Sequence, residues 1–172
     1  TASVKNLEFM MLLAHKIELR PTAEQADYLA RACGSRRHCY NQLLAHFKQD
    51  GVKWSKSAAY QFYIKEIRVA FPWYNEVSSR VTRNAIDDLD NAFKHFFRRV
   101  KSGKKQGGGG GYGFPAFKKH GIGDSFALRE APKFDVDGRL LRIEKLPTRI
   151  AMRQKLRFSG PTKQVTISQQ AG

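Results

Sequence analysis

A cationic and aromatic stretch between Asn91 and Gly123 contains no acidic residue and is the part of the chain best suited to binding a polyanion. Its basic residues are Lys94, Arg98, Arg99, Lys101, Lys104, Lys105, Lys118 and Lys119. Its aromatic residues are Phe93, Phe96, Phe97, Tyr112, Phe114 and Phe117. Ammonium and guanidinium groups bind phosphates and release counterions, while aromatic rings stack on bases. The pattern indicates nucleic acid as a partner, against the alternative of a solvated basic surface with no ligand.

A second group of residues has the chemistry to read bases. Arginine binds the edge of guanine and asparagine the edge of adenine in the major groove, each through two hydrogen bonds. Arg80, Arg83 and Asn84 lie on a long helical pattern that would fit such a groove, and Trp54 and Ser57 are weaker candidates for the same surface. The alternative is a solvated helix face on which Arg83 pairs locally with Asp87.

Other residues are better suited to the nucleic-acid backbone, where contacts position the protein without specifying sequence. The candidates for phosphate binding or stacking are Arg98, Lys104, Lys105, Phe114, Phe117, Lys118, Lys119 and Arg129.

The composition of the whole chain agrees with a nucleic-acid partner. Among 172 residues, 31 Lys and Arg face 15 Asp and Glu, which leaves a net charge of +16, more than solubility requires. The longest apolar run, Phe9 to Ala14, is too short to span a membrane, so we expect a cytoplasmic, nucleoid-associated protein. Cys33 and Cys39 are expected to be reduced core residues.

The elements that position these residues begin with a strand over residues 12–20, which Pro21 ends. Thr22 and Gln25 have the spacing of a capping box, which predicts the start of a helix. Gly34 is expected to end that helix.

Three further helices are expected. The second begins near Ser35 and ends before Asp50, and the third follows Ser55 and ends before Pro72. The apolar stripe of the third helix is expected at Tyr60, Tyr63, Ile64 and Ile67. The fourth and longest covers about residues 75–101. Its apolar positions, three and four apart, are Val77, Val81, Ala85, Leu89, Phe93, Phe96, Phe97 and Val100.

The composition changes after residue 101 to a glycine-rich segment that reads as a flexible linker. A hairpin is expected over residues 133–143 with its turn at Asp137-Gly138, followed by strands over 153–158 and 164–168. Strands at both ends and helices between them predict an α+β fold, a β-barrel or curled sheet with an inserted helical bundle.

No catalytic or metal site is expected from these residues. Asp135 and Asp137 would lie on one face of a hairpin strand with no third acid nearby, whereas two-metal chemistry requires clustered carboxylates. Asp87, Asp88 and Asp90 are the densest acidic group, but on one helix Asp88 points away from the other two, which nearby Arg83 and Lys94 can neutralise.

Four ordered segments of the chain resemble a known family. The first segment contains Pro21, Glu24-Gln25, Gly34, Arg37 and Tyr40-Asn41. The second contains Arg83-Asn84-Ala85, Leu89, Ala92-Phe93-Lys94 and Phe96-Phe97. The third and fourth are Gly113-Phe114-Pro115-Ala116-Phe117-Lys118-Lys119 and Asp124-Ser125-Phe126. Together they are similar to the N-terminal region of the TnpB family, transposon-encoded RNA-guided DNA nucleases related to type V CRISPR effectors.

This resemblance implies a wedge domain with an oligonucleotide-fold-like β-barrel, interrupted by a four-helix recognition domain. The expected boundaries are a first wedge strand at 10–21, the recognition domain at 22–101, the linker at 102–112 and the rest of the barrel at 113–172. The resemblance also implies guide RNA and double-stranded DNA as partners, with a short duplex motif recognised beside the target.

In the family, a RuvC-like nuclease domain follows this region and supplies the catalytic carboxylates. The chain ends at Gly172, so we expect a module that is not an enzyme on its own. Magnesium is expected only together with a nuclease domain. Two alternatives remain open: a stand-alone DNA-binding repressor, and one half of a split nuclease completed by a separate RuvC-like chain.

Overall fold

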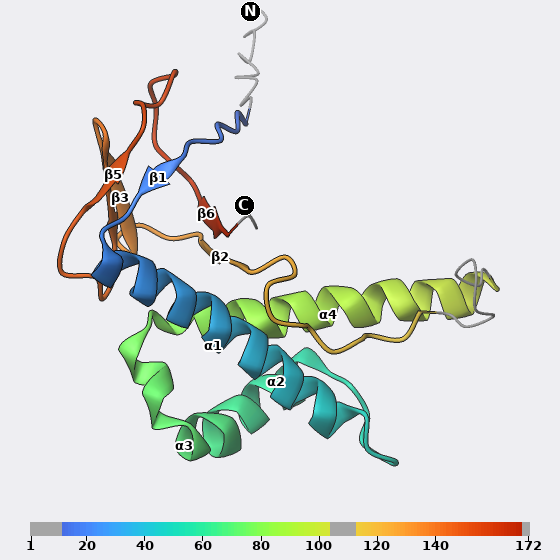
Figure 1. Ribbon diagram of the computed structural model, residues 1–172. Coiled ribbons are helices and arrows are strands. Elements are labelled where there is room, and N and C mark those ends of the chain that lie inside the picture. The colour runs from blue at the N-terminus through green and yellow to red at the C-terminus, as the bar shows by residue number, and fades with distance from the viewer. Residues whose placement is uncertain (1–11, 104–112, 170–172) are drawn as a thin grey trace, which may run out of the picture.

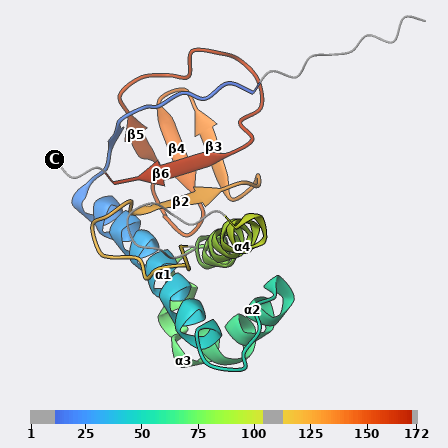
Figure 2. The same ribbon diagram turned by 90° about the vertical axis from the view of Figure 1, so that its right-hand side faces the viewer.

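Strands gather at one end of the molecule and short helices at the other, and two long helices connect them (Figures 1 and 2). The computed structural model describes residues 12–103 and 113–169. In chain order the elements are β1 (Leu19–Arg20), α1 (Ala23–Phe47), α2 (Lys56–Phe62), a π-helical turn (Tyr63–Ile67), α3 (Arg68–Ala70), a 3-10 helix (Pro72–Glu76), α4 (Ser79–Ser102), β2 (Ser125–Leu128), β3 (Phe134–Asp137), β4 (Leu140–Ile143), β5 (Ile150–Met152) and β6 (Val165–Ser168).

Helix α1 begins with the predicted capping box. Thr22 Oγ1 accepts from the Gln25 backbone N–H at 3.3 Å, and Gln25 Oε1 accepts from the Thr22 N–H at 3.0 Å. The prediction that Gly34 ends this helix is wrong, because α1 continues unbroken to Phe47. A glycine within a helix costs about 1 kcal/mol, and the buried neighbours Cys33 and Ser35 show that packing offsets this cost.

The third predicted helix begins as expected, with the Ser55 side chain accepting from the Ala58 N–H at 3.1 Å. Its middle is a π-helical turn, so the helix widens between α2 and α3. Tyr63 and Ile67 are buried as predicted, but Ile64 is exposed.

Helix α4 starts later than predicted, because Pro72–Glu76 forms a separate 3-10 helix and Ser78 caps the N-terminus of α4. It ends at Gly103, which adopts a left-handed conformation. The predicted apolar positions are buried through Phe93, whereas Phe97 and Val100 are exposed. The last turns of α4 therefore extend beyond the rest of the molecule (Figure 1).

The strands form two antiparallel sheets, one with the order β1-β5-β4-β3 and one that pairs β2 with β6. The predicted hairpin is present as β3 and β4, and Asp137 pairs with Leu140, so its two-residue loop is Gly138-Arg139, one residue later than expected. Leu19 of β1 pairs with Met152 of β5. These two strands are neighbours in the sheet, although all the helices lie between them in the sequence.

Two of the predicted strands differ from the structure. The pairing of the first is confined to Leu19–Arg20, although His15 and Ile17 keep the alternating burial of a strand. Residues 153–158 do not form a strand, and β5 precedes them at Ile150–Met152. Ile150 and Met152, the first and last residues of β5, are both buried. This alternation of apolar residues is stronger than that of the charged segment 153–158.

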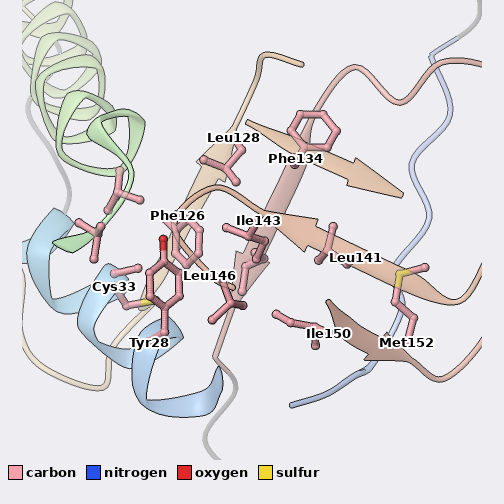
Figure 3. Packing of buried hydrophobic residues seen from close by; sticks show 14 residues of the cluster. Tyr28, Cys33, Phe126, Leu128, Phe134, Leu141, Ile143, Leu146, Ile150 and Met152 are labelled. Carbon is pink, nitrogen blue, oxygen red and sulfur yellow. The ribbon is translucent and has the colours of Figure 1, made fainter. Parts of the chain in front are cut away.

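The hydrophobic interior consists of two clusters. The first joins both sheets to the N-terminal half of α1, where Tyr28 and Cys33 face Phe126 and Leu146 (Figure 3). The second lies among the helices and includes Leu43, Leu44, Tyr63, Leu89 and Phe93. Cys33 and Cys39 are both buried and unbonded, as predicted.

The structure confirms an α+β fold with antiparallel sheets. Within the described ranges, the pairing does not close the two sheets into one barrel, and the first two predicted helices form the single helix α1, so the predicted four-helix bundle is not confirmed. The four domain boundaries stay a prediction. Most of the predicted linker, residues 104–112, lies outside the described residues.

Replacing Gly34 with alanine should stabilise the protein. A Cβ at this position would lie 3.8 Å from Arg37 Nη2, an ordinary contact, and the residue is already helical. We expect the free energy of unfolding to rise by about 0.5–1 kcal/mol, measured by urea denaturation. Gly138→Ala is the control, because Gly138 has a φ of 59° and should lose stability. A destabilised Gly34→Ala variant would contradict this account of α1.

Candidate nucleic-acid interface

A groove of about 490 Å³ lies between α2, α4 and the segment that follows β2. It is lined by Lys56, Ser57, Tyr60, Arg80, Arg83, Asn84, Ile86, Asp87, Arg129 and Glu130. Five of the residues singled out in the sequence therefore lie on one surface, namely Ser57, Arg80, Arg83, Asn84 and Arg129.

Most of the positive charge in this groove is paired internally. Lys56 Nζ lies 2.6 Å from Asp87 Oδ1, and Arg129 Nη1 lies 3.5 Å from Asp87 Oδ2. Arg80 forms an ion pair with Glu130. The groove thus contains four cations and two carboxylates, and the carboxylates occupy three of the cations.

Arg83 is the remaining cation of the groove. Its Nη2 donates to the Tyr60 hydroxyl at 3.1 Å, and its guanidinium carbon lies 5.5 Å from the centre of the Tyr60 ring. The local pair with Asp87 considered above does not form. Across the described parts of the chain, no carboxylate pairs with Arg83, and its Nε is buried without a hydrogen-bond partner. Arg83 is therefore held in position but not neutralised.

Asn84 has a different environment from its neighbour. Its side chain is buried, its Nδ2 donates to the Arg80 carbonyl at 2.8 Å, and its Oδ1 accepts from the Ala127 N–H at 2.8 Å. Both ends of the amide bind protein atoms, and the second bond joins α4 to β2. This geometry favours a structural role, and we do not retain Asn84 among the base-reading candidates.

Trp54 lies outside the groove. Its ring stacks on Phe93 with centroids 4.6 Å apart, contacts Phe47 edge-on at 4.9 Å, and places Nε1 3.4 Å from Asp90 Oδ1. These contacts make Trp54 part of the helical cluster, whereas Ser57 is exposed on the groove wall.

A second set of exposed residues lies on the last turns of α4 and on the segment 114–117 that follows it in the chain, and we call Phe97, Arg98, Val100, Phe114 and Phe117 the tip surface. Its three phenylalanines have exposed fractions of 51%, 42% and 49% in chain order. Phe114 forms T-shaped contacts with Phe93 and Phe96 and is still partly exposed to solvent. Arg98 is exposed and contacts His95. Lys104 and Lys105 lie outside the described residues.

Lys118 and Lys119 are adjacent in sequence but differ in environment. Lys118 Nζ lies 3.2 Å from Asp88 Oδ2 and 4.8 Å from the centre of the Tyr40 ring. Its backbone N–H and C=O both bind the Asn41 amide, at 2.8 and 3.0 Å. Lys118 therefore fixes its segment against α1, while Lys119 is exposed and better suited to a phosphate.

Sequence reasoning missed the polar contacts by which α1 holds the segment before β2. Arg36 pairs with Asp88 and donates to the Ser125 carbonyl at 2.6 Å. Arg37 Nη1 donates to both oxygens of Asp124, at 2.6 and 2.7 Å. Burial raises the pKa of Asp124, but hydrogen bonds from Arg37 and the Gly121 N–H outweigh it, so the pKa lies below its usual value.

Residues 12–103 and 113–169 contain no cluster of three or more His, Cys, Asp or Glu side chains that could hold a metal ion. The three acids on α4 bind separate cations: Asp87 contacts Lys56, Asp88 contacts Lys118, and Asp90 contacts Lys94. Within the same residues, no helix is both long enough and apolar enough to cross a bilayer.

Comparison with known proteins gives two matches. A family model described as a helix-turn-helix domain of the OrfB/IS605 type matches residues 10–50. In the structure most of this stretch is the single helix α1. The chain is also 28% identical over 166 residues to InsQ of Escherichia coli (strain K12), provisionally named an RNA-guided DNA endonuclease. The match covers 94% of this chain and 38% of InsQ, so the chain spans well under half the length of that relative.

The Arg37–Asp124 pair should contribute measurably to stability. Asp124→Asn removes a buried charge-assisted contact, and we expect the free energy of unfolding at pH 7 to fall by about 2 kcal/mol. Asp135→Asn is the control, because its pair with Arg149 is exposed and should change stability by less than about 0.5 kcal/mol.

The same pair predicts a pH dependence. Because folding lowers the pKa of Asp124, its contribution is complete above the usual value of 3.8 and is lost as the pH falls through the folded value. The stability difference between the original chain and Asp124→Asn should therefore shrink in acid. A difference that stays constant in urea titrations from pH 6 to pH 2 would contradict this assignment.

Proposed function

Since the chain is related to the N-terminal region of the TnpB family, we propose that it is the nucleic-acid-binding module of an RNA-guided DNA endonuclease of this type. In this proposal the groove between α2 and α4 recognises a short motif in duplex DNA, and the tip surface contacts guide RNA. Its place is in the cytoplasm, on nucleoid DNA.

The observation that carries the proposal is the state of Arg83. It lies on a long helix, beside the cations of a groove, and no carboxylate in the described parts of the chain neutralises it. Contact with Tyr60 restricts the guanidinium, so that less conformational freedom is lost on binding. A guanidinium held in this way suits the two acceptors on the major-groove edge of guanine.

The tip surface suits a different form of nucleic acid. Exposed rings beside a cation bind unpaired bases by stacking, which a paired duplex does not offer on its surface. Lys48 Nζ lies 5.7 Å from the centre of the Phe117 ring, so a cation already accompanies one of these rings. An RNA contact is therefore supported by the exposed rings of Phe97, Phe114 and Phe117 and by the exposed cation of Arg98.

Catalysis is assigned to the part of the full-length relative that this chain does not span. The relative's name describes an endonuclease, and the chain covers 38% of its length. The acids on α4 each pair with basic side chains, so they are poorly placed to share two metal ions. Magnesium would accordingly enter only with a RuvC-like nuclease domain or chain.

Arg83→Ala should weaken binding to the preferred duplex by about 1–3 kcal/mol and relax the preference at one base pair. The preferred duplex is first selected from a pool with randomised base pairs, and affinities are then measured by fluorescence anisotropy. Arg68→Ala is the matched control, because Arg68 is an exposed arginine of α3 outside the groove. Equal losses on every duplex would show that Arg83 contacts only phosphates.

The purified chain should not cleave DNA with any metal. We would incubate it with target duplex, its co-purified RNA and magnesium or manganese, beside an Asp87→Ala/Asp90→Ala variant. Cutting that depends on RNA and disappears in the variant would place an active site on α4 and refute the proposal.

Sequencing the co-purified RNA separates an RNA-guided module from a repressor that binds DNA alone, which would carry no defined RNA.

A further inference from the structure

Glu130 occupies an unusual position for an acid in a cationic groove. It lies two residues after the end of β2, its carboxylate pairs with Arg80 Nη2, and its side chain remains half exposed. Arg80 lies in the first turn of α4, one turn before Arg83. The Glu130 carboxylate thus pairs with Arg80, the arginine that lies next to Arg83 along the helix.

A carboxylate in this place affects two kinds of DNA contact unequally. A phosphate that approaches Arg80 is repelled by Glu130 and must compete with it for the guanidinium. The edge of a guanine carries no net charge, so Glu130 repels it much less than it repels a phosphate. Because phosphate contacts are the sequence-independent part of binding, an acid that weakens them raises the share of the binding free energy that depends on sequence.

We propose that Glu130 sets the sequence selectivity of the groove by withholding Arg80 from the phosphates of duplex DNA. The proposal rests on the function proposed above, that this groove binds duplex DNA. Asp87 acts on Lys56 and Arg129 in the same sense, but it holds two cations from two elements, so its removal would also loosen the groove wall. Glu130 holds one cation and is the cleaner residue to test.

The test compares Glu130→Gln with Asp135→Asn, a control well matched in charge and environment. Each substitution removes one negative charge from an acid paired with an arginine, and the two acid side chains are 50% and 49% exposed. Asp135 lies on β3, outside the groove lining. The difference between the variants therefore measures the local effect of Glu130 apart from the change in net charge.

The probe is a fluorescent 25-base-pair duplex pool with eight randomised base pairs, titrated at several potassium chloride concentrations. Glu130→Gln should bind the pool about three- to tenfold more tightly than Asp135→Asn. The slope of log affinity against log salt should become more negative by about 0.9, the value for one additional phosphate contact. Sequencing of the bound fraction should show a broader preference than for the unsubstituted chain.

Two further comparisons make the result decisive. In an Arg80→Ala background, Glu130→Gln should no longer differ from Asp135→Asn, because no guanidinium remains to be released. Equal affinities, slopes and sequence preferences of the two single variants in the original background would overturn the inference while leaving the proposed function intact. Absence of binding by every variant, even at low salt, would refute the proposed function, and this inference with it.

Discussion

The continuity of α1 is the constraint on which the rest of the structure depends. Its first half is buried against the sheets through Tyr28 and Cys33, and its second half is buried among the helices through Leu43 and Leu44. The helix α1 therefore joins the two hydrophobic clusters, and α4 is the second long helix that contributes residues to both. A break at Gly34 would remove one of the two long helices that hold the strands against the helical cluster and leave α4, with its Asn84–Ala127 hydrogen bond, as the other.

The polar side of α1 has an equally specific role. Arg37 holds Asp124, and the Asn41 amide holds the backbone of Lys118, so the segment leading to β2 is fixed at both ends. Asn84 then ties α4 to Ala127 within β2. Arg129 and Glu130 follow immediately, so the third wall of the groove is positioned by Arg37, Asn41 and Asn84, of which only Asn84 is among the residues that line the groove. Several residues that support the family resemblance therefore act by positioning others.

The local features of the fold could be read from the sequence, while features decided by distant contacts could not. The capping box at Thr22, the Ser55 cap and the hairpin each depend on residues a few positions apart, and all are present. The prediction of a helix end at Gly34 is wrong because helix propensity takes no account of the tertiary packing around α1. Asn84 could not be recognised as structural because its partner Ala127 lies 43 residues away. An asparagine next to an arginine on a helix looks the same in sequence whether it faces solvent or a strand.

Net charge indicates nucleic acid as the class of partner, but it does not indicate where on the molecule positive charge is available. The value of +16 counts Lys56, Arg80 and Arg129 fully, although carboxylates occupy all three in the groove. It counts Arg83 equally, although this residue contacts Tyr60 and pairs with no carboxylate among the described residues. Binding that is selective requires cations that are positioned and few, because every additional free cation attracts phosphates of any sequence. The acids of the groove, Asp87 and Glu130, therefore determine which cations remain available to a ligand. A count of basic residues alone leaves out this effect.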